Sequence, residues 1–96
     1  MEDYSVYIIT NKPNGVLYIG LTKRLIIRMS QHKRKVHPKT FSARYNLNKL
    51  VYYESFDTKN KGLRREKQLK TWNRDWKIRL IERMNPNWND LSLELK

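Results

Sequence analysis

The segments Val6-Tyr7-Ile8-Ile9 and Leu17-Tyr18-Ile19-Gly20 decide the fold of this chain. Both are rich in β-branched and aromatic residues, which favour strands, and the intervening Pro13-Asn14-Gly15 has the composition of a tight turn. These features predict a β-hairpin over residues 4–10 and 16–19. Apolar residues run almost without interruption through both strands, so we expect other elements to cover the sheet on both faces.

The rest of the chain predicts one more strand and three helices. Residues 49–56 are strand-like, and residues 35–48 form a connection with at most one short helical turn. The helices are expected from Thr22, as N-cap, to residue 34, over residues 59–72 after Asp57-Thr58, and over residues 74–83 before Asn85-Pro86. Their expected inward side chains are Leu25, Ile26 and Met29, then Leu63, Leu69 and Trp72, then Trp76, Ile78, Leu80 and Ile81. Together they predict an α+β fold, a small three-stranded antiparallel sheet flanked by about three helices in a single domain over residues 1–96.

Composition limits the classes of function. The 96 residues include 21 Lys and Arg against 9 Asp and Glu, a net charge of +12, and a polyanion is the natural partner for such a chain. There is no cysteine, and two histidines are too few for a zinc cluster. His37 is expected in a loop. Apolar runs are only strand-length and the start does not resemble a signal peptide, so we expect a soluble, cytoplasmic protein.

A small set of side chains suits phosphodiester cleavage, which needs a proton acceptor, a cation facing the phosphate and a metal-binding carboxylate. Tyr7 and Tyr18 offer phenols, Arg28 and His32 lie four residues apart on one helix face, and Glu66 offers a carboxylate. Each also has an ordinary interpretation. The tyrosines suit a packed cross-strand pair, Arg28 and His32 a solvated helix face, and Glu66 an ion pair with a lysine four residues on.

The order of these residues resembles the GIY-YIG nuclease superfamily. The similarity rests on Tyr7, then Tyr18-Ile19-Gly20, Leu25, Arg28, His32 and the later Glu66. It is strongest to small stand-alone bacterial members, which are similar to the N-terminal catalytic module of the bacterial excinuclease. The chain departs from the first half of the motif, because Ser5-Val6 replaces Gly-Ile before the tyrosine.

The resemblance implies a role for each residue. Tyr7 would act as the general base, with Tyr18 positioning water or phosphate, and Arg28 would stabilise negative charge on the phosphate. His32 would orient a tyrosine hydroxyl or contact phosphate. Glu66 would hold one Mg²⁺ or Mn²⁺ ion, bound weakly without substrate.

Further positions are candidates for contact with nucleic acid. Gly20 permits close approach of backbone or substrate. The candidate phosphate-binding cations flank the site residues and are Lys33, Arg34, Lys35, Lys39, Arg44, Arg64, Arg65 and Lys70. Many relatives carry an asparagine twelve residues after the glutamate, where this chain has Ile78, and Asn85 or Lys70 are candidates to replace it. No base-reading motif is evident, so we expect little sequence specificity.

The leading hypothesis is a metal-dependent DNA endonuclease in DNA repair or processing, with a repair-complex protein as a candidate partner. The alternative is a catalytically weak or inactive nucleic-acid-binding module of the same fold. RNA is a second possible target, because phosphate contacts do not distinguish the sugars. The sequence leaves the oligomeric state open.

Overall fold

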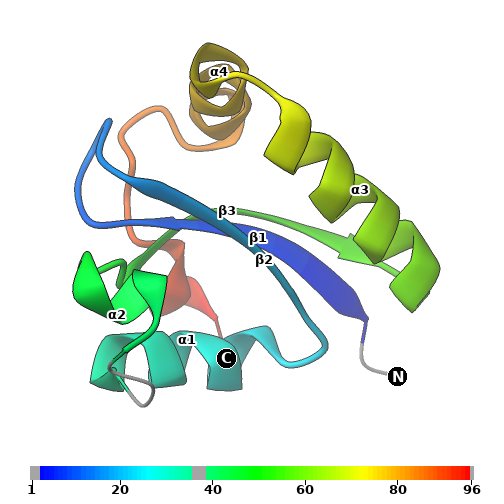
Figure 1. Ribbon diagram of the computed structural model, residues 1–96, viewed down its shortest axis with the longest axis horizontal. Coiled ribbons are helices and arrows are strands. Elements are labelled where there is room, and N and C mark those ends of the chain that lie inside the picture. The colour runs from blue at the N-terminus through cyan, green and yellow to red at the C-terminus, as the bar shows by residue number, and fades with distance from the viewer. Residues whose placement is uncertain (1–2, 36–38, 96) are drawn as a thin grey trace.

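Three antiparallel strands in the order β2-β1-β3 form the centre of the molecule (Figure 1). The computed structural model describes residues 3–35 and 39–95. Its elements are β1 (Tyr4–Thr10), β2 (Leu17–Thr22), α1 (Leu25–Arg34), α2 (Phe41–Arg44), β3 (Lys49–Phe56), α3 (Lys59–Thr71), α4 (Arg74–Met84) and the 3₁₀ helix η1 (Leu91–Glu94). The predicted α+β class and the three-stranded sheet are confirmed.

The turn between β1 and β2 has the chemistry that its sequence predicts. Gly15 N–H donates to Lys12 O at 2.9 Å, and Asn14 has a left-handed φ of 58°, which asparagine tolerates better than most residues. The Arg74 guanidinium at the start of α4 donates to the carbonyls of Asn14 and Gly15, at 2.5 and 2.6 Å. The turn is therefore fastened to the rest of the fold.

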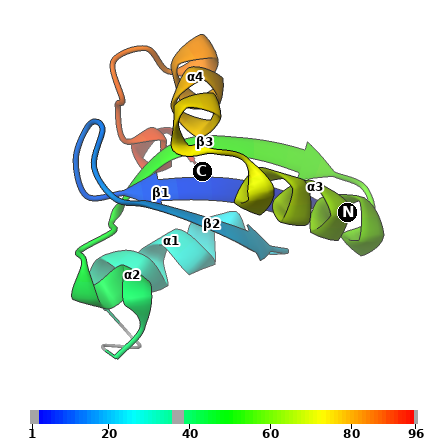
Figure 2. The same cartoon turned by 45° about the horizontal axis from the view of Figure 1, so that its top comes forward.

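Helices cover both faces of the sheet, as the continuous apolar runs predict. Val6 and Ile8 of β1 point to one face and pack in a cluster with Leu69 of α3 and Ile81 of α4. Residues 7 and 9 point to the other face and pack with Met29 of α1. Figures 1 and 2 show α3 and α4 on one side of the sheet, and α1 and α2 on the other. The central strand β1 is thus buried on both faces.

The helix boundaries agree closely with the sequence, but some exposures do not. Thr58 caps α3 as predicted, accepting from Lys61 N–H at 3.3 Å. Thr22 is instead the last residue of β2, and its hydroxyl accepts from Arg24 N–H just before α1 begins. The prediction that Ile26, Leu63 and Trp76 point inward is wrong, because they are 49%, 41% and 52% exposed.

The segment after α4 packs back onto the sheet through Asp90. The Asp90 carboxylate accepts from Leu50 N–H of β3 at 3.1 Å and from the Lys33 ammonium of α1 at 2.6 Å. It also caps η1 by accepting from Ser92 N–H. Within residues 3–35 and 39–95, no helix has the length and apolar character needed to cross a membrane.

Candidate active site

Tyr7 lies at the centre of the sheet, directly opposite Gly20 on the neighbouring strand. Its side chain is only 2% exposed. A Cβ atom built on Gly20 would lie 2.5 Å from both Cζ and Oη of Tyr7, which is far inside van der Waals contact. The phenol therefore crosses the space that any other residue at position 20 would fill. Glycine is required here for the tyrosine ring rather than for a turn.

The Tyr7 hydroxyl begins a chain of polar contacts that leaves the sheet. Its oxygen is 3.0 Å from His32 Nε2 on α1, and His32 Nδ1 is 3.0 Å from Ser42 Oγ on α2. When Nδ1–H donates to Ser42, Nε2 has a lone pair that accepts the phenol proton; the other neutral tautomer reverses both bonds. The geometry brings a proton acceptor into direct contact with the phenol. The hydroxyl that His32 contacts is that of Tyr7, and its role in orienting this hydroxyl stays a prediction.

Aromatic rings surround this hydrogen bond. The ring centroids of Tyr7 and Tyr18 are 6.5 Å apart, and those of Tyr18 and His32 are 6.1 Å apart. Phe41 at the start of α2 stacks on Tyr18 at 6.4 Å. A cavity of about 350 Å³ opens beside the rings, and its lining includes Tyr18, Arg28, His32, Lys35, Phe41 and Ser42. The hairpin, α1 and α2 each contribute to this cavity.

Burial and nearby charges set the protonation of the Tyr7 phenol. Burial raises the pKa of Tyr7 well above its ordinary value, and Tyr18 and Glu66 add to the increase. The Arg28 guanidinium acts in the opposite direction. The phenol is therefore neutral at physiological pH. Its pKa depends on Arg28 of α1 and Glu66 of α3 as well as on burial.

Glu66, the carboxylate that the sequence analysis predicts for the site, lies on α3. Its side chain is 19% exposed and its Oε2 is 3.3 Å from the Lys70 ammonium, one helical turn on. Among the described residues, no group of three His, Cys, Asp or Glu side chains could hold a metal ion together. Only an ion that needs few protein ligands fits this donor set. Mg²⁺ and Mn²⁺ meet that condition when water and phosphate supply the remaining oxygens.

Two of the candidate cations have intramolecular partners that the sequence analysis did not foresee. Lys33 pairs with Asp90 and also donates to Asn48 O at 2.8 Å. Arg65 places Nε and one NH₂ group 3.0 Å from Glu54 Oε2, and its guanidinium lies over the Trp72 ring. Both cations therefore hold elements of the fold together. The other members of the predicted set, all exposed, are Arg34, Lys35, Lys39, Arg44, Arg64 and Lys70.

The structure also tests the candidates for the family's additional asparagine. Ile78 packs against the core cluster on the α3 and α4 face, so it has no polar role. Asn85 is 3% exposed and its amide donates to Val51 O at 3.2 Å and to Asn89 O at 2.8 Å. Asn85 is buried and its amide is used in hydrogen bonds that stabilise the fold, so the idea that it replaces the family's additional asparagine is wrong. Lys70 does lie beside Glu66. His37 lies outside the described residues.

Sequence reasoning missed the contribution of α2. Ser42 and Phe41 come from a segment without sustained periodicity. In the structure Ser42 contacts His32 and Phe41 stacks on Tyr18 of the hairpin. Thr40 was the available signal, since it caps α2 by accepting from Ala43 N–H at 3.4 Å. That cap identifies a short helix but not the histidine that it faces.

Comparison with known proteins agrees with this geometry. The sequence profile of the GIY-YIG catalytic domain matches residues 3–79. The chain is also 37% identical over 82 residues to UPF0213 proteins of Staphylococcus aureus, including those of strains Mu3, Mu50 and N315. The aligned region covers 85% of this chain and 98% of each relative. No solved structure matches the chain at a comparable level of significance.

The match over residues 3–79 identifies a nuclease-type domain, a class whose substrate is nucleic acid. The chain belongs to the GIY-YIG family, whose nucleases generally use a divalent metal. The departure from the family motif at Ser5-Val6 lies in β1, next to Tyr7. Ser5 and Val6 are buried in β1, and Val6 packs in the core on the opposite face from Tyr7.

Proposed function

We propose that this protein is a divalent-metal-dependent DNA endonuclease that hydrolyses phosphodiester bonds, with little intrinsic sequence specificity, in DNA repair or processing. The observation that carries the proposal is the bond between the Tyr7 hydroxyl and His32 Nε2 beside a cavity lined by Arg28. A buried phenol here contacts an imidazole, beside a cavity that a guanidinium lines. It is a suitable arrangement for moving a proton next to a phosphate.

The proton path follows from the raised pKa of Tyr7. A neutral phenol is a poor base, so Tyr7 needs an acceptor for its own proton when it takes one from water. His32 Nε2 is that acceptor, and Ser42 holds the opposite ring nitrogen. As the water oxygen bonds to phosphorus, its proton passes to the Tyr7 oxygen and the phenol proton passes to His32. The bond between phosphorus and the leaving oxygen breaks at the same time, and that oxygen takes a proton from solvent. Tyr18 packs against both rings and positions the attacking water.

Arg28 and a metal ion held by Glu66 would both stabilise negative charge on the phosphate. Arg28 lines the cavity and supplies a planar guanidinium that can contact two phosphate oxygens as negative charge grows on them. Glu66, with Lys70 nearby, would hold the metal ion. When bound, the ion supplies Lewis-acid polarisation of the phosphate and stabilisation of the leaving oxygen. A single carboxylate binds such an ion weakly, so substrate and metal should bind cooperatively.

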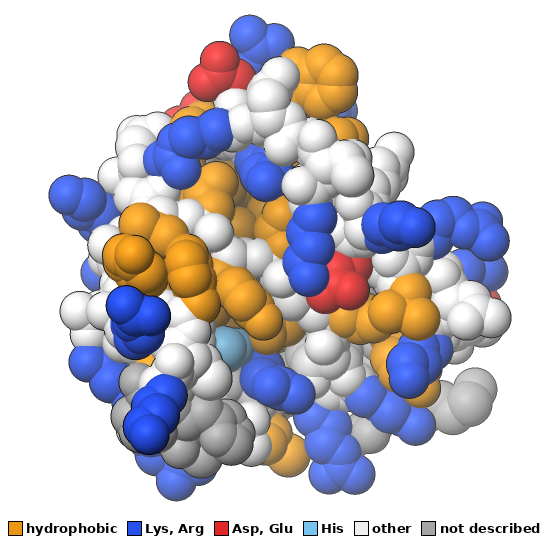
Figure 3. Space-filling view, in the orientation of Figure 1, with side chains coloured by type: hydrophobic (Ala, Val, Ile, Leu, Met, Phe, Trp, Pro, Cys, Tyr) orange, Lys and Arg blue, Asp and Glu red, His pale blue; other side chains and the backbone are white. Residues whose placement is uncertain are grey.

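The charge distribution supports nucleic acid as the substrate. Figure 3 shows Lys and Arg side chains spread over the face of the molecule that is seen in Figure 1, around a group of hydrophobic side chains. Lys35 lines the catalytic cavity, and Lys39 and Arg44 are exposed on the segment that includes α2. These cations contact the strand backbone in the proposal. Lys33 and Arg65 are left out because each already has a carboxylate partner.

The test is cleavage of supercoiled plasmid, flap and single-stranded DNA in Mg²⁺, Mn²⁺ or EDTA. We expect nicking by the wild type with either metal, none in EDTA, and at least ~100-fold slower nicking by Glu66→Gln. Asp57→Asn is the matched control, because Asp57 is an exposed acid paired only with Lys61 among the described residues. Wild-type protein that binds all three DNAs and nicks none of them contradicts the proposal and favours the inactive binding module. Competition with a matched RNA oligonucleotide at fixed salt decides between the two nucleic acids.

A further inference from the structure

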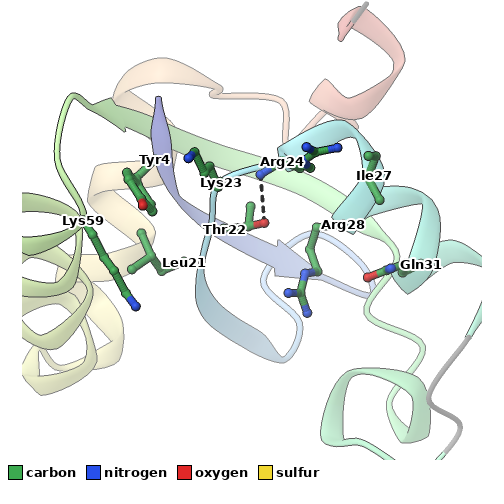
Figure 4. A pocket seen from close by; sticks show the side chains of 9 residues that line it. All are labelled: Tyr4, Leu21, Thr22, Lys23, Arg24, Ile27, Arg28, Gln31 and Lys59. Carbon is green, nitrogen blue, oxygen red and sulfur yellow. Dashed lines mark hydrogen bonds between the residues drawn. The ribbon is translucent and has the colours of Figure 1, made fainter. Parts of the chain in front are cut away.

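A second cavity lies next to the catalytic one, between the end of β2 and the first residues of α1 and α3. Its volume is about 410 Å³, and its lining includes the apolar side chains of Leu21 and Ile27. Lys23, Arg28 and Lys59 supply positive charge. Figure 4 shows Lys59 and Arg28 approaching the end of β2 from opposite sides, one from α3 and the other from α1. None of the described residues that line this cavity is acidic.

The two cavities are parts of one surface. Arg28 and Gln31 line both of them, so the guanidinium that faces the catalytic rings also forms a wall of the second cavity. A strand whose scissile phosphate lies at Arg28 must continue on one side of it. The second cavity offers the continuing strand positive charge and apolar lining residues against which sugar atoms can pack. Lys23 and Lys59 line this second cavity and not the catalytic one.

These two lysines differ from the cations that stabilise the fold. In the part of the chain that the structure describes, no carboxylate lies within 4.0 Å of either ammonium, whereas Lys33 and Arg65 each contact one. The Lys23 ammonium lies 5.6 Å from the ring centroid of Tyr4, which also lines the cavity. Their charge is thus available to an anion from outside.

We propose that the cavity between α1 and α3 binds the backbone phosphate that neighbours the scissile one, with Lys23 and Lys59 as its ligands. The inference rests on the proposed function for the position of the scissile phosphate. It assigns the direction in which the strand leaves the catalytic centre, from Arg28 past the end of β2 to the start of α3. It also makes two lysines outside the family's motif into substrate-positioning residues.

The test measures binding of fluorescein-labelled single-stranded and duplex oligonucleotides by fluorescence anisotropy, without divalent metal, over salt concentrations of about 50 to 300 mM. We expect Lys23→Gln/Lys59→Gln to bind about tenfold more weakly than wild type. Its slope of log Kd against log salt should be smaller by about 0.9 on duplex, or about 0.7 on single strands, the value for one lost phosphate contact. Lys12→Gln/Lys77→Gln removes the same charge outside both cavities and should change Kd by no more than about twofold.

A double variant that matches its charge control in both Kd and slope overturns the inference. Urea unfolding should show equal midpoints for the two variants, because Lys23 and Lys59 are exposed. The measurement needs no turnover, so it is independent of the nicking assay. If the wild type nicks DNA and the double variant keeps the Kd and salt slope of its charge control, only this inference is overturned. A lowered slope together with no nicking by wild type removes only the proposed function.

Discussion

Substitution of Gly20 by alanine tests whether the glycine exists to admit the Tyr7 ring. The new methyl would lie 2.5 Å from Tyr7 Cζ and Oη and 2.8 Å from Cε1. The ring has little freedom to move, since it is 2% exposed and its hydroxyl contacts His32. Overpacking of this kind typically costs about 1–3 kcal/mol, against a gain of about 0.4–1 kcal/mol from a less flexible unfolded chain. We expect a net loss of roughly 1–2 kcal/mol.

The effect on activity should exceed the effect on stability. A ring shifted by about 1 Å breaks the alignment of Tyr7 with His32 and the attacking water, which can lower turnover roughly 100-fold. Urea unfolding followed by tryptophan fluorescence measures the loss of stability, and single-turnover nicking at saturating protein measures the loss of activity. The DNA Kd should stay within about twofold, because the Arg28 and lysine contacts are unaltered.

Gly62→Ala is the matched control. Its methyl would lie 2.7 Å from Leu21 Cδ1, the far end of a side chain that can rotate, while its next neighbour is 3.6 Å away. Gly62 lies inside α3, where alanine is favoured by about 1 kcal/mol. This variant should be equally or more stable and fully active. If Gly20→Ala unfolds and nicks like Gly62→Ala, the ring does not depend on the glycine and the reasoning is refuted.

Three further outcomes follow from particular contacts. Ser42→Ala should lower kcat about tenfold, because it removes the hydroxyl that contacts His32 Nδ1, while the DNA Kd stays nearly unchanged. The unfolding midpoint should fall only slightly, since the other contact of this hydroxyl among the described residues is Thr40 Oγ1 at 3.3 Å; an unchanged kcat would remove Ser42 from the proton path. Burial raises the pKa of Asp90, but hydrogen bonds from Lys33, Ser92 and Leu50 outweigh it, so the pKa is lowered. The resulting stabilisation is present at neutral pH and is lost as the pH falls below about 4. Urea unfolding at neutral pH and at about pH 3 should therefore show a smaller difference for Asp90→Asn than for wild type, and equal differences would contradict this. Burial, and then the hydrogen bond to Glu54, raise the pKa of Tyr52, so the contribution of Tyr52 to folding stability is intact below about pH 10 and lost at higher pH. Between about pH 9 and 11.5, Tyr52→Phe should lose less stability than wild type. An equal loss would assign the alkaline effect to other groups.

The fold was predictable where local chemistry decides it. Residues 49–56 form the third strand as their bulky residues predict, and Thr58 caps α3 as its hydroxyl predicts. Inward directions were less predictable, because helical periodicity fixes which residues share a face but not how wide the contact with the sheet is. Met29 is buried at the centre of the α1 stripe, while Ile26 at its edge is half exposed. A narrow contact on a small sheet explains that difference.

The candidate site was predictable as a set of residues but not as a network. Tyr7 and His32 follow from the spacing of the motif, whereas the step from His32 to Ser42 depends on the path of a connecting segment. Ion pairs such as Arg65 with Glu54 join different elements, so no helical spacing reveals them. The role of Gly20 was visible only once the strand register placed it opposite Tyr7.

The central claim is that the Tyr7 hydroxyl takes part in bond cleavage, and removing that one oxygen tests it most directly. Single-turnover plasmid nicking in Mg²⁺ should be at least ~100-fold slower for Tyr7→Phe than for wild type, with an unchanged DNA Kd. Tyr45→Phe, which removes a hydroxyl from an exposed ring outside the catalytic cavity, should nick at the wild-type rate. Equal nicking rates for Tyr7→Phe, Tyr45→Phe and wild type would contradict the account.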